Sequence, residues 1–207
     1  MREWFMRAPS MVVAYLRQRA RLRLLVPLSV LLAFAGASFP ALWIASLRDI
    51  AIATVQAFAL ILAFRIWDDF EDRESDRVRH PDRVLASASR AAPLRLLGFA
   101  LGFASVLSLT MSVFAFRRLA AIAFATAMLS VRYGARSENR RSHAVGEHIL
   151  AIKYPLFAYS VAPTLPTDVV TPRISAILFV VYALVCVYAY ADDVELRHVF
   201  TSRRSTT

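Results

Sequence analysis

The chain has 207 residues, of which 58% are hydrophobic, and its mean hydropathy is +0.50, which is too apolar for an ordinary soluble domain. The formal net charge is +10, and Lys153 is the only lysine, so almost all of the positive charge comes from arginine. Because the arginines flank apolar segments and form no basic domain of their own, we expect a lipid bilayer as partner and no nucleic acid. A single cysteine, Cys186, excludes a disulfide framework.

Residues 1–23 form the first predicted element, in which aromatic and aliphatic side chains alternate irregularly with arginines. This composition predicts an amphipathic helix that lies in the membrane interface. A signal peptide is the weaker interpretation, because the apolar run that follows is long and further apolar segments come after it.

Residues 24–196 are expected to form an all-α, polytopic transmembrane bundle of about six spans. A spanning helix needs about 20 residues, and the first three segments and the sixth reach the lower limit of about 17. The fourth is short, so we expect either that the flanking Arg118 and Arg132 snorkel or that the bilayer is thinned around it. The fifth carries Lys153, Pro155 and Pro163, which predicts a kinked helix that lines the bundle interior. The six segments are Leu24–Ser46, Ile50–Trp67, Leu96–Phe116, Leu119–Val131, Ile149–Thr164 and Ile174–Ala191.

The arginines alternate between the loops. They are dense before the first segment, in the 68–95 and 132–148 loops and in the tail, residues 197–207, and they are sparse in the three intervening loops. The positive-inside rule therefore predicts a protein integral to the cytoplasmic membrane with both termini in the cytoplasm.

A run of carboxylates directly follows the second apolar segment, beginning with Asp68. Asp69, Asp72 and Asp76 fall at i, i+3 and i+7, so a helix would place them on one face. Like charges at this spacing repel each other, and hard oxygen ligands suit Mg²⁺. The run predicts a magnesium site at the mouth of a membrane helix; the alternative is a solvated acidic loop that pairs with its own arginines.

A second acidic group stands at the matching end of the sixth segment and consists of Asp192, Asp193 and Glu195. Both groups are predicted on the same side of the bundle. Together they predict two sets of Mg²⁺ ligands that face each other across a cavity.

Three cations are candidates for binding phosphate. Pro81 is expected to end the helix after the acidic run, so that Arg79 and Arg83 fold back, and the guanidinium fork matches phosphate oxygens. Lys153 lies inside an apolar segment, where an ionisable residue is a functional candidate by default. Cytoplasmic anchoring of the arginines and snorkelling of the lysine are the alternatives.

These residues resemble the UbiA superfamily of intramembrane prenyltransferases. The first motif of the family is N-D-x-x-D-x-x-x-D, followed by a basic stretch that often contains H-P-D-R. It corresponds here to Asp68–Asp76, with Asp68 in place of the usual Asn, and to His80–Arg83. The second motif, D-x-x-x-D after the sixth span, is imperfect around Asp192. A lysine in the fifth span commonly contacts diphosphate in the family, and Lys153 looks like its counterpart.

The resemblance implies an Mg²⁺-dependent enzyme that transfers a polyprenyl group from its diphosphate to an acceptor, which the sequence does not identify. It implies Asp69, Asp72, Asp76 and Lys153 as catalytic residues, and Arg79, Arg83 and Lys153 as diphosphate ligands. The implied metal ligands are Asp68, Asp69, Asp72, Asp76, Asp192, Asp193 and Glu195. The family usually has nine spans, so the six expected here indicate a short divergent member, a truncated form, or one completed by a partner subunit or a second copy.

Two other classes remain as alternatives. The CDP-alcohol phosphotransferases also combine about six spans with an Asp-rich motif, but that motif needs a glycine where Arg73 follows Asp72. The imperfect second motif and the smaller number of spans also allow a degenerate, non-catalytic subunit or scaffold of a membrane complex.

Overall fold

The structure is a computed structural model that describes residues 11–18, 22–40, 45–87, 91–134, 140–165 and 171–204. Side chains are described throughout these ranges except at 22–23, 87, 140–147 and 189–204. The described chain is all-helical and contains no strand, which confirms the predicted all-α class.

Within the described ranges, six long helices make up the bundle, with two short helices, α4 and α5, between α3 and α6. A further helix at residues 11–18, called here the N-terminal helix, precedes them. The labelled helices are α2 (Leu22–Ala37), α3 (Leu47–Glu71), α4 (Arg73–Arg79), α5 (Val84–Ser87), α6 (Ala92–Thr110), α7 (Ala115–Gly134), α8 (Arg140–Val161) and α9 (Pro172–Arg204).

Several helices differ in length from the predicted apolar segments. α2 ends at Ala37, well before Ser46, whereas α8 starts ahead of the fifth segment and continues through Pro155. α9 continues past Ala191 to Arg204, so most of the expected tail is helical. Apolar runs predict which part of a helix is buried or meets lipid, and they say little about polar turns at its ends.

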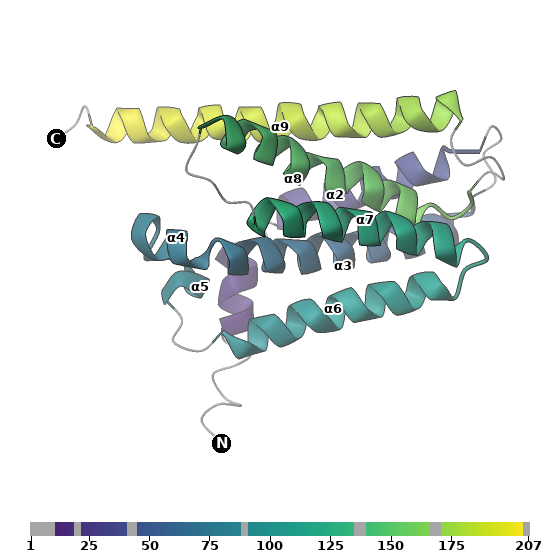
Figure 1. Ribbon diagram of the computed structural model, residues 1–207, viewed down its shortest axis with the longest axis horizontal. Helices are drawn as coiled ribbons and strands as arrows, with labels where there is room; N and C mark the ends of the chain where they lie inside the picture. The colour runs from purple at the N-terminus through teal and green to yellow at the C-terminus, as the bar shows by residue number, and fades with distance from the viewer. Residues whose placement is uncertain are drawn as a thin grey trace, which may run out of the picture.

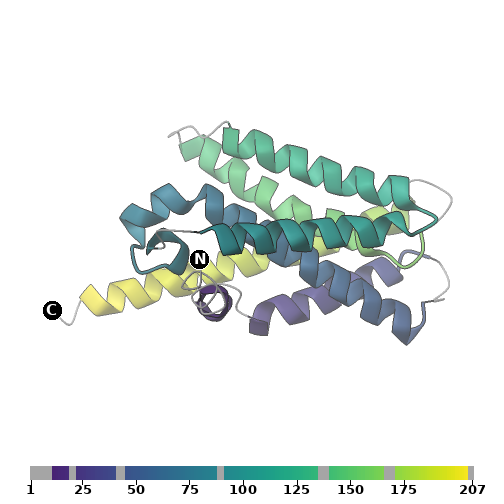
Figure 2. The ribbon, with the colours of Figure 1, turned by 90° about the horizontal axis from the view of Figure 1, so that it is seen from below.

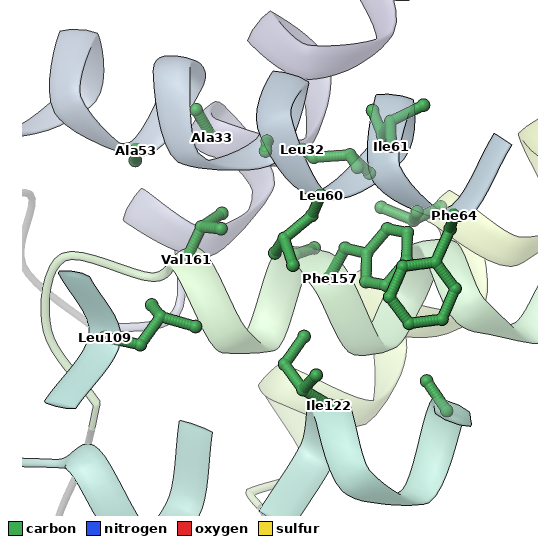
Figure 3. Packing of buried hydrophobic residues seen from close by; sticks show 14 of the residues in the cluster. Leu32, Ala33, Ala53, Leu60, Ile61, Phe64, Leu109, Ile122, Phe157 and Val161 are labelled. Atoms are coloured by element: carbon green, nitrogen blue, oxygen red, sulfur yellow. The ribbon is translucent and has the colours of Figure 1, made fainter. Parts of the chain in front are cut away.

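α3 is the central helix. It starts at a capping box in which the Ser46 hydroxyl accepts from the Asp49 amide at 3.2 Å, while the Asp49 carboxylate accepts from the Ser46 amide at 3.0 Å. From there an apolar sequence free of proline and glycine runs to the acidic end of the helix. Leu60 and Phe64 lie in the main core, where Phe64 meets Phe157 of α8 edge to face with ring centroids 4.9 Å apart (Figure 3).

α2 and α8 approach each other at Gly36. A Cβ at this position would lie 2.7 Å from the Ala158 carbonyl oxygen and 2.9 Å from the Ala162 Cα. The two backbones are therefore in contact, and only glycine fits between them.

The long helices run side by side, with successive ones reversing direction (Figure 1). The ends of α3, α7 and α9 lie at the same end of the bundle as the starts of α6 and α8. α4 therefore lies at the same end of the bundle as the end of α7 and the start of α8. The orientation predicted from the arginine alternation stays a prediction.

The N-terminal helix crosses the bundle: it is seen end-on in Figure 2, where α3 and α6 run lengthwise. Its Tyr15 is fully buried in a second core with Leu62 and Ile66 of α3 and Leu94 of α6. Whether this helix also lies in a membrane interface stays a prediction.

Among the described residues, α3 and α6 are the two helices that are both long and apolar enough to cross a membrane. α6 also exposes large apolar side chains, including Phe99 and Phe103, the second of which is 71% exposed. A surface of this kind suits lipid or a protein partner better than water. The coarse expectation of membrane association is supported by these two helices, and the six-span arrangement stays a prediction.

Candidate functional site

The acidic run lies across the junction of α3 and α4. α3 ends at Glu71, Asp72 stands between the two helices with φ −83° and ψ −5°, and α4 follows directly. Helix-type hydrogen bonds continue through the junction, from the Asp72 amide to the Asp68 carbonyl at 3.0 Å and from the Asp76 amide to the Asp72 carbonyl at 2.8 Å. α4 ends at Arg79, ahead of Pro81, as expected. The carboxylates therefore lie on two consecutive helices that meet at Asp72 and share backbone hydrogen bonds across the junction.

Asp68 is bonded from two other helices. The Lys153 ammonium of α8 donates to Oδ2, and the Tyr133 hydroxyl of α7 donates to Oδ1. Lys153 is only 5% exposed and Asp68 is also buried. The structure therefore brings together two of the predicted site residues from distant parts of the chain.

Asp69 faces a different set of partners. The Tyr15 hydroxyl of the N-terminal helix donates to its Oδ2 at 2.7 Å, and Arg65 Nε lies 3.8 Å from Oδ1. The carboxylate is 3% exposed. A buried carboxylate without such donors would be costly, so these contacts are what permit an ionised Asp69 in the core.

Asp76 and the basic stretch form a closed unit. Arg83 folds back as predicted, but its guanidinium pairs with Asp76. Arg73 Nε donates to the Leu85 carbonyl at 3.1 Å and so ties the start of α4 to α5. Arg79 is exposed at the end of α4.

The predicted magnesium site can be compared with this geometry. Within the described residues, no three His, Cys, Asp or Glu side chains gather as a metal-binding group. Asp68, Asp69 and Asp76 accept from lysine, tyrosine and arginine instead of facing one another. In this arrangement Asp68 and Asp69 each have both oxygens directed at internal donors or cations. Binding of Mg²⁺ by these carboxylates stays a prediction.

The second acidic group lies in the C-terminal part of α9. It consists of Asp192, Asp193 and Glu195, whose side chains are outside the described residues. The predicted pairing of two acidic groups across a cavity therefore stays a prediction.

Two tyrosines of the site were not predicted from the sequence. Tyr15 was expected only as part of an interfacial helix, and Tyr133 falls in the predicted 132–148 loop, for which no site residue was predicted. The one available signal was their position near helix ends, because a buried tyrosine usually needs a hydrogen-bond partner for its hydroxyl.

Arg118 corrects the expectation for the fourth segment. Its side chain is 6% exposed and does not snorkel outward; it donates to the carbonyls of Ala162 and, at 3.1 Å, Pro163. These carbonyls directly follow α8, and an arginine there satisfies acceptors that the helix end leaves without partners.

The arrangement combines buried carboxylates, an ammonium and tyrosine hydroxyls at one end of a helical bundle, and Arg79 is exposed at the end of α4. Comparison of the chain with protein-family models, with curated proteins and with solved structures finds no match. The chemistry of the site itself is therefore the basis for assigning a function.

Proposed function

We propose that the protein is an intramembrane transferase that moves a polyprenyl group from its diphosphate to an acceptor. The observation that supports this most is the contact between Lys153 and Asp68. It joins the lysine of the fifth predicted span to the acidic run after the second, which are the two features that the proposed chemistry needs at one place.

An apolar groove gives further support. It measures about 450 Å³, lies between α3 and α6, and is within the size range of ligand sites. Val55 in its wall, Leu62 and Asp69 are spaced seven residues apart and so share one face of α3. From Val55 to Asp69 is about 21 Å along the helix. The groove therefore lies along the same face of α3 as Asp69, and the buried Leu62 lies between them. The groove lining is Ala51, Ile52, Val55, Gln56, Ala59, Ala104, Ser105 and Ser108.

In the proposed reaction the positive residues act on the leaving group. Lys153 holds its charge where negative charge grows on the diphosphate as the allylic C–O bond breaks. Arg79 supplies a guanidinium that matches phosphate oxygens. Mg²⁺, which the resemblance implies, would neutralise further charge on the diphosphate. No proposed step involves a bound metal, since the described carboxylates are engaged by other side chains.

We further propose six spans in a cytoplasmic membrane, with both termini and the acidic run on the cytoplasmic side. The arginine alternation supports this orientation. The exposed phenylalanines of α6 support contact with lipid.

A non-catalytic subunit or scaffold is the second candidate, and one observation favours it. The carboxylates of Asp68 and Asp69 are neutralised by partners within the chain, as expected of a polar core that holds helices together. Such a protein would keep the fold without binding diphosphate.

Binding of farnesyl diphosphate to the purified protein, with and without MgCl₂, separates the two candidates. We expect Mg²⁺-dependent binding by the wild type. Asp68→Asn/Lys153→Met removes the central pair without leaving one buried charge alone, and we expect it to abolish binding. Arg79→Gln should weaken binding by about tenfold, the value of one charge-assisted contact. Arg77→Gln, an exposed arginine of the same helix, is the matched control. A wild type that binds no diphosphate under either condition would favour the scaffold.

A further inference from the structure

The N-terminal helix forms hydrogen bonds to both ends of the stretch from Asp69 to Val84, which contains the acidic run and the arginines that follow it. At the entry, the Tyr15 hydroxyl donates to Asp69 at 2.7 Å. At the exit, the Gln18 side-chain amide donates to the Asp82 carbonyl at 3.1 Å and accepts from the Val84 amide at 2.7 Å. One short helix thus contacts the stretch immediately before α4 and immediately after it.

These contacts rest on a well-packed base. The Tyr15 ring is fully buried and lies in a cluster with Ile66 of α3, Leu85 of α5 and Leu94 of α6. The N-terminal helix lies crosswise over this region (Figures 1 and 2). Apolar packing therefore holds this helix in place against α3, α5 and α6, and Tyr15 and Gln18 make their polar contacts from that position.

The stretch from Asp69 to Val84 is also held by one contact within it and one to the residue that follows it. Arg83 pairs with Asp76, and Arg73 bonds to the carbonyl of Leu85. α4 and the turn that follows therefore behave as one unit. The backbone hydrogen bonds across Asp72 join this unit to α3, and Arg95 of α6 lies 5.1 Å from the centroid of the Phe70 ring. The N-terminal helix adds hydrogen bonds at both ends of the unit.

We propose that the N-terminal helix is a clamp on the stretch from Asp69 to Val84, and that Tyr15 and Gln18 are positioning residues for the diphosphate site. The second half of this proposal rests on the function proposed above. The clamp goes beyond an interfacial anchor, because it sets where the exposed Arg79 and the carboxylate of Asp69 stand relative to Lys153.

The chemistry of the two side chains suits this role. A hydroxyl bonded to a carboxylate makes a charge-assisted hydrogen bond, which holds the carboxylate in one orientation and stabilises its ionised form. An amide side chain can donate and accept at once. Gln18 uses both capacities on the backbone of the turn, so it fixes that turn without adding a charge that would compete for phosphate or metal.

The test uses the variant Tyr15→Phe/Gln18→Ala, which keeps the buried ring and removes the polar contacts. Limited digestion with trypsin in detergent is the first measurement, because the clamped stretch carries Arg77, Arg79 and Arg83. Cleavage of a folded protein follows the population of the open form. We expect cleavage within this stretch to become about tenfold faster, in line with the loss of a hydrogen bond to a charged group.

The second measurement is binding of farnesyl diphosphate with MgCl₂, for which we expect affinity to fall by about tenfold, as when an outer-shell partner of a site is removed. Tyr159→Phe is the matched control, because this ring packs against Phe39 at the opposite end of the bundle. Gln18→Glu keeps the acceptor for the Val84 amide and should restore part of the protection against trypsin.

The outcomes separate the clamp from the proposed function. Unchanged cleavage in the double variant overturns the clamp, whatever happens to binding. Faster cleavage with unchanged diphosphate affinity overturns the positioning role. If the double variant is cleaved faster and the wild type binds no diphosphate, the clamp is supported and the proposed function is contradicted.

Discussion

Lys153 of α8 and Asp68 of α3 form a buried ion pair across 85 residues of sequence, and Tyr133 of α7 donates to the same carboxylate. One aspartate therefore bonds to two neighbouring helices. A pair of this kind costs desolvation energy on both sides, and its members depend on each other.

The first prediction concerns this dependence. Lys153→Met alone leaves a buried carboxylate with a hydroxyl donor and no cation, so we expect a loss of about 3 kcal/mol of stability. Asp68→Asn/Lys153→Met removes both charges and should recover most of that loss. Unfolding in detergent of Asp68→Asn, Lys153→Met and the double variant gives the coupling energy. Strictly additive effects would contradict an energetically coupled pair.

The close contact of α2 and α8 gives a second prediction. Gly36→Ala forces a methyl group into the backbone of α8, so we expect destabilisation by about 2 kcal/mol or more. Gly102→Ala is the matched control, because nothing lies within 4 Å of a Cβ there. This control should be stabilised by about 0.5–1 kcal/mol, since alanine is the better helix former. Equal unfolding temperatures for the two variants would argue against the observed helix crossing.

A third prediction concerns Arg118. Its guanidinium is buried and bonded to the Ala162 and Pro163 carbonyls. Arg118→Met keeps much of the apolar stem but leaves these carbonyls without their donor, so we expect a loss of about 2 kcal/mol. Arg48→Met, an exposed arginine, should change stability by less than about 0.5 kcal/mol. Thermal unfolding in one detergent compares the two, and a stable Arg118→Met protein would show that the bonds do not support the fold.

The fourth prediction concerns orientation in the membrane. Val78 in α4 and Val113 in the turn between α6 and α7 are 84% and 96% exposed, and they lie at opposite ends of the bundle. In a Cys186→Ser background, Val113→Cys should react with an impermeant maleimide from outside the cell, and Val78→Cys only after the membrane is opened. Reaction of both from the same side would contradict the six-span arrangement.

Local features of the fold were predictable from the sequence. The helical class follows from the long apolar runs, and the end of α4 follows from Pro81, which cannot continue a helix. The return of Arg83 toward α4 also follows from that turn. Local chemistry decides all three, and none depends on how distant helices are placed.

The partners of the carboxylates were not predictable. That Lys153 meets Asp68 depends on the register between α3 and α8, which side-chain packing such as that of Phe64 on Phe157 determines. Sequence spacing gives the face of a helix but not its neighbour. Arg118 was mistaken for a snorkelling residue for the same reason: its acceptors belong to a segment that follows another helix.

Asp68 and Asp69 are consecutive, yet their contacts point in different directions: the first toward α7 and α8, the second toward the N-terminal helix. Successive residues of a helix are turned by about 100°. The two acids therefore fix the rotation of α3 about its own axis, because turning it to improve one set of bonds would break the other. Inserting a single residue into α3 between Phe64 and Asp68 would therefore rotate both carboxylates away from their partners at once, even where the apolar packing of Phe64 was kept.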